Sequence, residues 1–523
     1  MTRTVIVTPS GRRTLRGFTF FALAVASLHA QQAAKPAEAA TMAAPTDIKS
    51  ALNAAEAALG SKDLNSIEYT ATGFSSNIGQ SYNPSSPWPK FDVTSYTRTI
   101  NYARRASKEE MTRIQGYNQA KGGGAPIMGE QRQNQQVNGN AAWNVTGAGP
   151  VAQFGATAEE RQLQIWLTPA GFIKAARLGN GCAIHWDCEA KLISKTEGGK
   201  KVNVISAVLA GKFPAEATLD DKNLIAKIET KIPSPVLGDM AVVTTFSGYK
   251  DYNGVKFPSK ITQTQGGFMA SDLNIKDAKP NAPAEIAVPD AVKDAEVPSP
   301  RVDVQLLSDG VWYLTGGTHH SLVVEFKDYM AIIEAPLNEE RSNAILTEAR
   351  HLVINKPLKY VINTHHHFDH SGGLRTMVAE GATIVTSAIN KPYYDKAFAA
   401  KATVEPDKLS KSPKAPSYVL ISDKYLLTDG TQKIEIYPMK DEMHNEGMLL
   451  VYLPSGKVLV EADEWNPPAS GDIQPPAGTT PAPAVALYDN IQRLKLDVSK
   501  IAPIHGRLVT MADFLKYLGK SKT

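Results

Sequence analysis

The chain has 523 residues, 42% of them hydrophobic and 21% charged, and is long enough for two domains that each have a core. Its formal net charge of +4 comes from the N-terminus, because residues 1–30 contain four arginines and no acidic residue. Subtracting these four charges leaves zero, so the apparent basicity belongs to the N-terminal segment and no nucleic-acid partner is expected.

Residues 1–30 have the pattern of a secretory signal peptide, with arginines before the apolar run Phe18–Leu28 and small residues that offer cleavage positions. The apolar run is too short to cross a bilayer comfortably, so no stable membrane span is expected in the mature chain. Arg12-Arg13 suggests the twin-arginine route and leaves the general secretion route open. We expect a periplasmic or secreted protein in which residues 31–45 form a linker.

Residues 46–275 predict a β-rich accessory domain. A helix is expected over Asp47–Leu59, and the segments after it alternate polar and apolar residues, as in Ile67–Thr72 and Val242–Phe246, with a hairpin signal at Asn253-Gly254. This pattern predicts an antiparallel sheet curved like a half-barrel, and the strand order resembles periplasmic lipoprotein carriers. A domain that positions or dimerises the rest of the chain is the favoured alternative to lipid carriage, and the oligomeric state stays open.

Two segments predict irregular structure. Residues 119–141 are rich in Gly, Gln and Asn and are expected to form a mobile loop. Residues 276–301 are rich in Pro and Ala and are expected to link the accessory domain to a second domain at residues 302–523.

The chain has two cysteines, Cys182 and Cys188, separated by five residues. An exported protein lives where disulfides persist, so we expect a local disulfide between them. A metal site that uses both cysteines and His185 is less favoured, because it offers only three good ligands at an unfamiliar spacing.

The segment Thr364–His370 predicts a transition-metal site. It contains four histidines and an aspartate, follows the apolar run Leu358–Asn363 of a predicted buried strand, and precedes Ser371–Arg375, which predicts the start of a helix. Side chains at such a strand-to-helix turn can converge on one point, and histidine is the commonest metal ligand in proteins.

The spacing His365-x-His367-x-Asp369-His370 resembles the signature of the metallo-β-lactamase superfamily. The resemblance covers residues 302 to 520 and implies an αββα sandwich with two metal ions. The implied ligands of the first metal are His365, His367 and His444. The implied ligands of the second are Asp369, His370 and His505, and Asp463 bridges the two.

The resemblance implies a hydrolase. Imidazole and carboxylate ligands suit zinc, so we expect two zinc ions per chain, with iron or manganese as alternatives. A hydroxide shared by such ions is nucleophilic near neutral pH, because bound metal lowers the pKa of water from about 15.7 to about 7. Asp369 is the expected catalytic residue, since its counterpart ligates the second metal and can hydrogen-bond the hydroxide.

The expected substrate is a small molecule with an ester-like bond, such as an ester, a thioester or a lactone. Asp463 argues against β-lactams, because zinc β-lactamases usually have a cysteine or a smaller polar residue at that position. One alternative function is an iron-dependent oxidative member of the superfamily, such as a persulfide dioxygenase. Another is a ligand-binding envelope protein with a structural metal site.

The chain departs from the superfamily pattern after Met330–Ile333, where most members carry Asp-Thr-Gly and this chain has Glu334-Ala335-Pro336. The carboxylate that usually supports a metal ligand is therefore either supplied by Glu334 or absent. Non-ligand roles are favoured for His366 and for His319-His320, which match no ligand position.

Two insertions, at residues 391–413 and 467–481, lack the periodicity of core elements and are expected to border the site. Tyr393, Tyr394 and Trp465 are expected to form an apolar pocket wall, with packing beneath their own loops as the equal alternative. Glu446 and Glu464 are further candidates for that wall.

Overall fold

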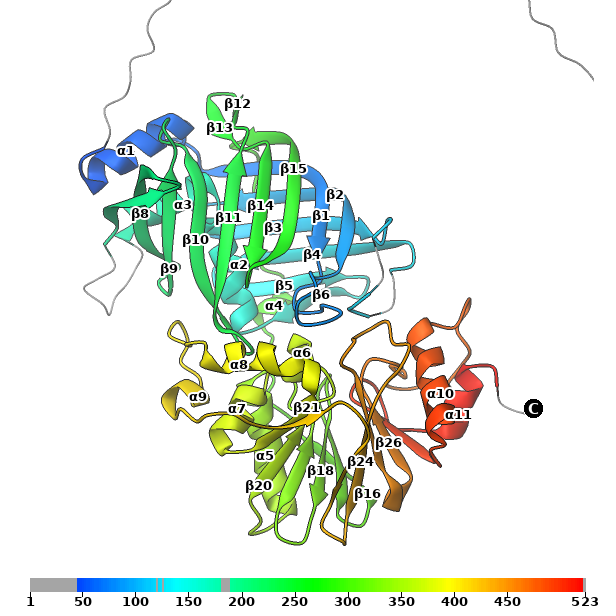
Figure 1. The fold of residues 1–523 in the computed structure, drawn as a ribbon. Helices are drawn as coiled ribbons and strands as arrows, with labels where there is room; N and C mark the ends of the chain where they lie inside the picture. The colour runs from blue at the N-terminus through cyan, green and yellow to red at the C-terminus, as the bar shows by residue number, and fades with distance from the viewer. Residues whose placement is uncertain (1–44, 119–120, 125–126, 180–188, 521–523) are drawn as a thin grey trace, which may run out of the picture. The chain divides into compact units, whose positions relative to one another are not determined.

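The computed structural model describes residues 45–118, 121–124, 127–179 and 189–520 (Figure 1). The predicted signal peptide and the predicted disulfide between Cys182 and Cys188 lie outside the described residues. From Pro45 onward the chain forms one compact unit. No helix among the described residues has the length and apolar character that a bilayer crossing requires.

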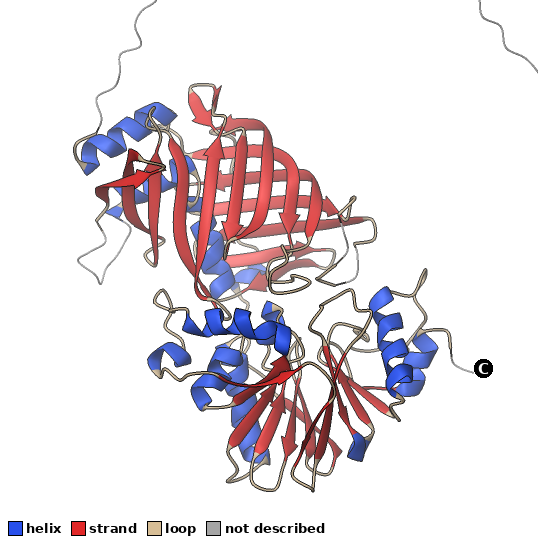
Figure 2. Cartoon of the chain, viewed as in Figure 1, coloured by secondary structure: helices blue, strands red, loops and turns tan. Residues whose placement is uncertain are grey.

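The first part of the chain forms a large antiparallel sheet with a few helices, which confirms the β-rich prediction (Figure 2). Its thirteen strands follow the order β6-β5-β4-β3-β2-β1-β15-β14-β11-β10-β9-β8-β7, and β12 and β13 form a separate hairpin. In chain order the elements are α1 (Ile48–Leu59), β1 (Ser66–Ser76), β2 (Lys90–Asn101), β3 (Ala106–Ile114), β4 (Glu130–Asn138), β5 (Ala141–Thr146), β6 (Gly149–Gln153), α2 (Ala156–Trp166), α3 (Pro169–Arg177), β7 (Lys191–Glu197), β8 (Lys200–Leu209), β9 (Phe213–Leu219), β10 (Ile225–Ser234), β11 (Gly238–Ser247), β12 (Lys250–Tyr252), β13 (Val255–Phe257), β14 (Lys260–Gln265) and β15 (Phe268–Pro280).

Local sequence explains the ends of these elements. The Asp47 side chain caps α1 by accepting a hydrogen bond from the Ser50 backbone N–H, and Gly60 ends the helix at φ +64°. The β12–β13 hairpin turns at Asn253-Gly254, where both residues have positive φ, as a tight hairpin turn requires.

The prediction of a mobile loop over residues 119–141 is wrong for β4, which pairs along its whole length with β3. Its polar side chains bond to one another and to the neighbouring strand: Gln136 donates to Asn134, and Asn134 donates to Glu110. Gln135 and Gln136 also line a cavity of about 410 Å³ inside this part of the chain. A strand that faces a polar interior has the amino-acid composition of a loop. Composition alone therefore predicts a loop where the structure has β4.

The connection to the second part of the chain is partly structured. β15 continues to Pro280, so the sheet includes residues that the sequence placed in the linker, and α4 (Asp290–Lys293) follows. Ile286 and Val292 of this segment are buried against Trp143. The segment is therefore packed onto the first sheet.

The second part has two sheets face to face with helices on both outer sides, which confirms the predicted αββα sandwich (Figure 2). The first sheet runs β16 to β22 in sequence order and the second β23 to β28. The elements are β16 (Asp303–Ser308), β17 (Val311–Thr315), β18 (Ser321–Glu325), β19 (Met330–Ile333), α5 (Glu339–Leu352), β20 (Leu358–Ile362), α6 (Phe368–Ser371), α7 (Leu374–Glu380), β21 (Thr383–Ser387), η2 (Ala388–Asn390), α8 (Lys391–Ala399), α9 (Lys408–Lys411), β22 (Ser417–Ile421), β23 (Tyr425–Thr428), β24 (Lys433–Pro438), β25 (Leu449–Leu453), η3 (Pro454–Gly456), β26 (Val458–Glu461), α10 (Ala482–Leu494), β27 (Lys500–Pro503), β28 (Val509–Thr510) and α11 (Met511–Tyr517).

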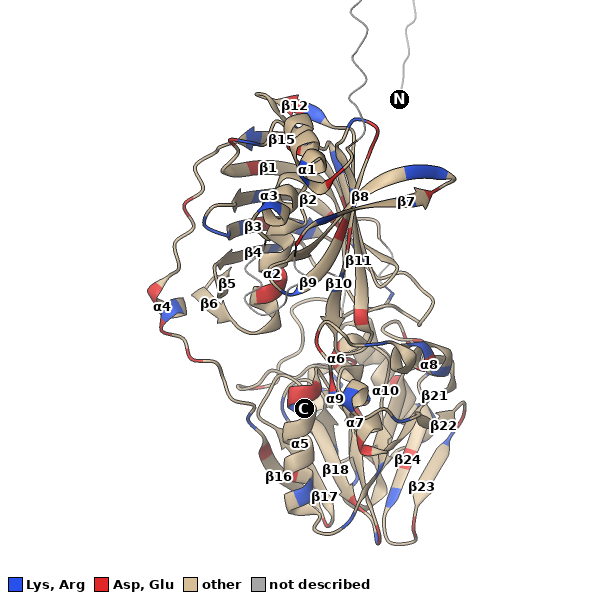
Figure 3. Ribbon diagram, turned by 90° about the vertical axis from the view of Figure 1, so that its left-hand side faces the viewer, with Lys and Arg blue, Asp and Glu red and all other residues tan. Residues whose placement is uncertain are grey.

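Strands of this sandwich are apolar on both faces because each sheet is covered on both sides. In β18, Leu322 and Val324 pack between the two sheets, whereas Val323 packs against the helices outside the first sheet. Acidic and basic residues are interspersed along the described ribbon, which agrees with the zero net charge of the chain beyond residue 30 (Figure 3).

Candidate metal centre

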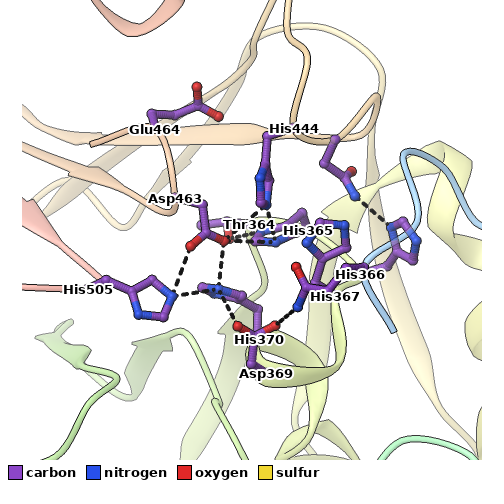
Figure 4. Close-up of polar contacts among 12 residues, drawn as sticks. Thr364, His365, His366, His367, Asp369, His370, His444, Asp463, Glu464 and His505 are labelled. Carbon is purple, nitrogen blue, oxygen red and sulfur yellow. Dashed lines mark hydrogen bonds and ion pairs between the residues drawn. The ribbon is translucent and has the colours of Figure 1, made fainter. Parts of the chain in front are cut away.

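The predicted ligands lie at the ends of strands from both sheets of the sandwich. His365, His367, Asp369 and His370 follow β20, and the last two lie within the short helix α6. The other three follow β24, β26 and β27 respectively, and are His444, Asp463 and His505. Figure 4 shows the five histidines of this set gathered around Asp463.

The first group of side chains consists of His365, His367, His444 and Asp463, whose potential ligand atoms all lie within 4.8 Å of one another. Asp463 Oδ2 lies 3.3 Å from His365 Nε2 and 3.1 Å from His444 Nε2. The three imidazoles are buried, so the group is shielded from bulk water.

The second group consists of Asp369, His370, His505 and His319. Asp463 contacts this group too, because its Oδ2 lies 2.8 Å from His370 Nε2 and its Oδ1 lies 2.9 Å from His505 Nε2. The two groups therefore adjoin at one carboxylate.

Asp463 is held in a left-handed turn, with φ at +66°, a conformation that few residues other than glycine adopt. The buried carboxylate of Glu461 closes this turn by accepting hydrogen bonds from the backbone N–H groups of Glu464 and Trp465. Burial raises the pKa of Glu461 to about 8.

The donor set fits a pair of divalent cations. His367 Nε2 lies 2.8 Å from the backbone oxygen of Ser81, which can only accept, so Nε2 carries the hydrogen and Nδ1 presents a lone pair. That Nδ1 atom is buried and has no hydrogen-bond partner among the described residues. An imidazole nitrogen oriented in this way is what a metal ion binds.

The pKa directions of the metal-free protein also fit cation binding. Burial, followed by neighbouring histidines, lowers the pKa of His365 and His367, so both stay neutral, which is the metal-binding form. Burial opposes a charge on His370 as well, but Asp463 and Asp369 raise its pKa above the usual value. A cation between these carboxylates can replace that proton.

Glu334 supplies a carboxylate where the sequence departs from the superfamily pattern. Its Oε2 lies 3.0 Å from His370 Nδ1, and its Oε1 accepts a hydrogen bond of 2.6 Å from the Thr364 backbone. The side chain is fully buried. Glu334 therefore holds the His370 ring so that Nε2 faces Asp463.

We expect Glu334→Gln to lower the affinity of the second group of side chains for a metal ion by about 10- to 100-fold, as is usual when a partner of a ligating histidine is lost. The amide cannot provide the charged acceptor that His370 Nδ1–H contacts. Competition with a chromophoric zinc chelator measures the affinity, and Glu340→Gln on the outer helix α5 is the matched control. Equal affinities for both variants would contradict this role.

His319 and His366 have different surroundings. The sequence favoured a non-ligand role for His319, but its Nε2 lies 3.3 Å from Asp369 Oδ2 and the side chain belongs to the second group. No motif marks it, because it reaches the centre from the loop after β17. His366 lies apart, contacting Ser81 Oγ and Asn445, and burial lowers its pKa to about 3. His320 contacts Tyr313.

The predicted pocket wall differs from the structure. Tyr394 is fully buried and its hydroxyl donates to Asn363, while Trp465 packs on Phe514, so both are core residues. Tyr393 approaches a histidine side chain, with its ring centre 5.5 Å from that of His366, and the Tyr394 hydroxyl lies 3.5 Å from the backbone oxygen of His365.

The insertion at residues 391–413 is not irregular, because it contains α8 and α9. Glu464 is buried, and burial followed by nearby Glu442 raises its pKa. Glu446 instead contacts Asn83.

Sequence reasoning missed the connection between β1 and β2, which reaches the centre from the first part of the chain. Gln80 Nε2 donates a hydrogen bond of 2.7 Å to Asp369 Oδ1. Ser81 contacts both His367, through its backbone oxygen, and His366, through its hydroxyl. Nothing in the composition of this polar segment marks it as part of a metal centre.

An αββα sandwich with adjoining histidine and aspartate groups at the ends of its strands supports a metallohydrolase-type enzyme. Residues 288–501 match the family model of the metallo-beta-lactamase superfamily, so this part of the chain is similar to that superfamily. His505 and the β1–β2 connection lie outside the matched residues.

Solved structures similar to the chain include three metallo-β-lactamases. The enzyme from Pontibacter korlensis is 20% identical over 42% of this chain and 98% of its own, with a TM-score of 0.32. The enzyme from Hirschia baltica is 15% identical, the match covers 42% of this chain and 99% of that enzyme, and the TM-score is 0.31. FIM-1 from Pseudomonas aeruginosa, in its mono-zinc form, is 16% identical, the match covers 43% of this chain and 96% of FIM-1, and the TM-score is 0.31. No curated protein sequence matches the chain.

Proposed function

We propose that the protein is an exported hydrolase that uses two zinc ions to cleave an ester-like bond in a small molecule. The observation that carries the proposal is the position of Asp463, whose two oxygens contact histidines of both groups. When bound, two such cations supply a nucleophilic hydroxide near neutral pH and polarise the substrate carbonyl.

The side chains of this chain have distinct tasks in that reaction. His365, His367 and His444 would hold the first cation, and Asp369, His370 and His505 the second, with Asp463 shared. Asp369 is the most exposed member of the set, with 29% of its side chain accessible against 18% for His505, so it can face the substrate side. There it would orient the nucleophile by accepting a hydrogen bond from it.

The substrate class follows from the same residues. An aspartate at position 463 supports ester, thioester or lactone hydrolysis in preference to β-lactam hydrolysis, as the superfamily pattern indicates. The arginine-rich, apolar N-terminus supports a periplasmic or secreted location. Neither nucleic acid nor a membrane span in the mature chain is part of this proposal.

Metal analysis of the purified mature protein tests the metal assignment. We expect about two zinc ions per chain, and we expect His367→Ala to deplete the first group because it removes the imidazole whose Nδ1 lacks a partner. His351→Ala, an exposed histidine on α5, is the control. Stoichiometric iron with oxygen consumption, or no metal after expression in zinc-replete medium, would overturn the zinc assignment.

A substrate screen then tests the reaction class. It includes esters, thioesters, lactones, β-lactams, sulfate esters and phosphodiesters, each with the metal-loaded and the chelator-treated protein. Hydrolysis confined to a β-lactam would contradict the argument from Asp463, and metal binding without any turnover would favour a structural metal site.

A further inference from the structure

We infer that the β1–β2 connection, residues 77–89, is a working part of the metal centre, in which Gln80 is a positioning residue for Asp369. This inference deepens the proposed function, because it rests on metal binding by the two groups described above. It assigns a task to the first part of the chain, which the superfamily match does not include.

The two oxygens of the Asp369 carboxylate have different partners. Its Oδ1 accepts the 2.7 Å hydrogen bond from the Gln80 amide, while its Oδ2 lies 3.3 Å from His319 Nε2 and 3.7 Å from His370 Nε2. An amide donor is neutral and cannot replace a cation, yet it fixes the rotation of the carboxylate. Gln80 thereby leaves Oδ2 directed toward the second group.

The next residue acts on the first group. The Ser81 backbone oxygen accepts from His367 Nε2, which fixes the tautomer of that ring and directs Nδ1 toward the other ligands. The Ser81 hydroxyl lies 3.0 Å from His366 Nε2, and Asn445 Nδ2 lies 2.9 Å from His366 Nδ1. Two consecutive residues of one connection therefore contact a candidate ligand of each metal.

The connection is held in place by its backbone, so these contacts do not depend on flexible side chains alone. The Gly79 oxygen accepts from the Phe368 N–H at the start of α6, and the Tyr82 oxygen accepts from the Glu446 N–H. Gly79 has φ +77°, and a Cβ there would lie 2.3 Å from Phe368 Cγ. Only glycine allows the connection to approach α6 this closely.

The test replaces Gln80 by methionine, which keeps the length of the side chain and removes the donor. We expect Gln80→Met to weaken metal binding at the second group by about 10- to 100-fold and to leave the first group unchanged. Cobalt substitution supplies a second readout, since the visible absorption of the second site should change when the carboxylate rotates. Both measurements are independent of turnover.

Asn83→Ala is the matched control, because Asn83 lies in the same connection and contacts Glu446 but no candidate ligand. An equal loss of affinity for metal in both variants would show that the connection only packs against the second part of the chain, and would overturn the role of Gln80 in positioning Asp369. Wild-type affinity and an unchanged cobalt spectrum in Gln80→Met would also overturn it. Failure of the wild-type protein to bind metal would instead contradict the proposed function.

Discussion

Asp369→Asn is expected to keep the fold and the first metal while lowering turnover by several orders of magnitude. The aspartate is the side chain whose two oxygens face Gln80 on one side and His319 on the other. Asparagine offers one oxygen in place of two and carries no charge, so the second metal and the orientation of the nucleophile are lost together.

The measurement combines zinc stoichiometry with turnover of the substrate that the screen identifies. Asp395→Asn is a matched control, because Asp395 is an exposed residue of α8 that pairs with Lys391 far from any candidate ligand in the sequence. Circular dichroism establishes that each variant is folded. Wild-type turnover in a folded Asp369→Asn protein would remove this aspartate from the mechanism.

Trp465→Ala is expected to destabilise the protein by about 3–5 kcal/mol, as is usual for removing a buried aromatic side chain. The indole is 4% exposed, and its ring centre lies 4.8 Å from that of Phe514 and 5.2 Å from that of Tyr517. The substitution therefore removes the ring contacts that Trp465 makes with α11 and leaves a cavity.

Urea denaturation followed by circular dichroism measures this loss as a lower midpoint. Leu306→Ala is the control, because Leu306 is 59% exposed and its truncation should change stability by about 0.5 kcal/mol or less. An unchanged midpoint together with a changed Michaelis constant would contradict the core role and would support the hypothesis that Trp465 lines the substrate pocket.

The sandwich and the seven ligand candidates could be predicted because the spacing His365-x-His367-x-Asp369-His370 resembles the signature of the metallo-β-lactamase superfamily. Each candidate lies next to an apolar strand, and strand ends of packed sheets meet at one edge. What could not be predicted is which side chains support these candidates from elsewhere in the chain.

At the candidate metal centre, the contacts that the sequence does not indicate join residues that are distant in the chain. Gln80 and Asp369 are 289 residues apart, and no pattern within either segment indicates the contact. Tyr394 and Trp465 are aromatic residues near candidate ligands, so a pocket wall and a core are equally compatible with the sequence. Only the positions of Asn363 and Phe514 distinguish the two.

The backbone contacts of the β1–β2 connection also determine the order in which the centre can be completed. Residues 77–89 are synthesised before β20 and the histidines that follow it, so their candidate partners do not yet exist when they are made. His505 is synthesised last of the seven candidate ligands. A cation that binds the finished centre favours the state in which both parts of the chain are folded and joined, and stabilises that state by mass action. Metal bound as proposed would thereby couple the unfolding of the first sheet to that of the sandwich.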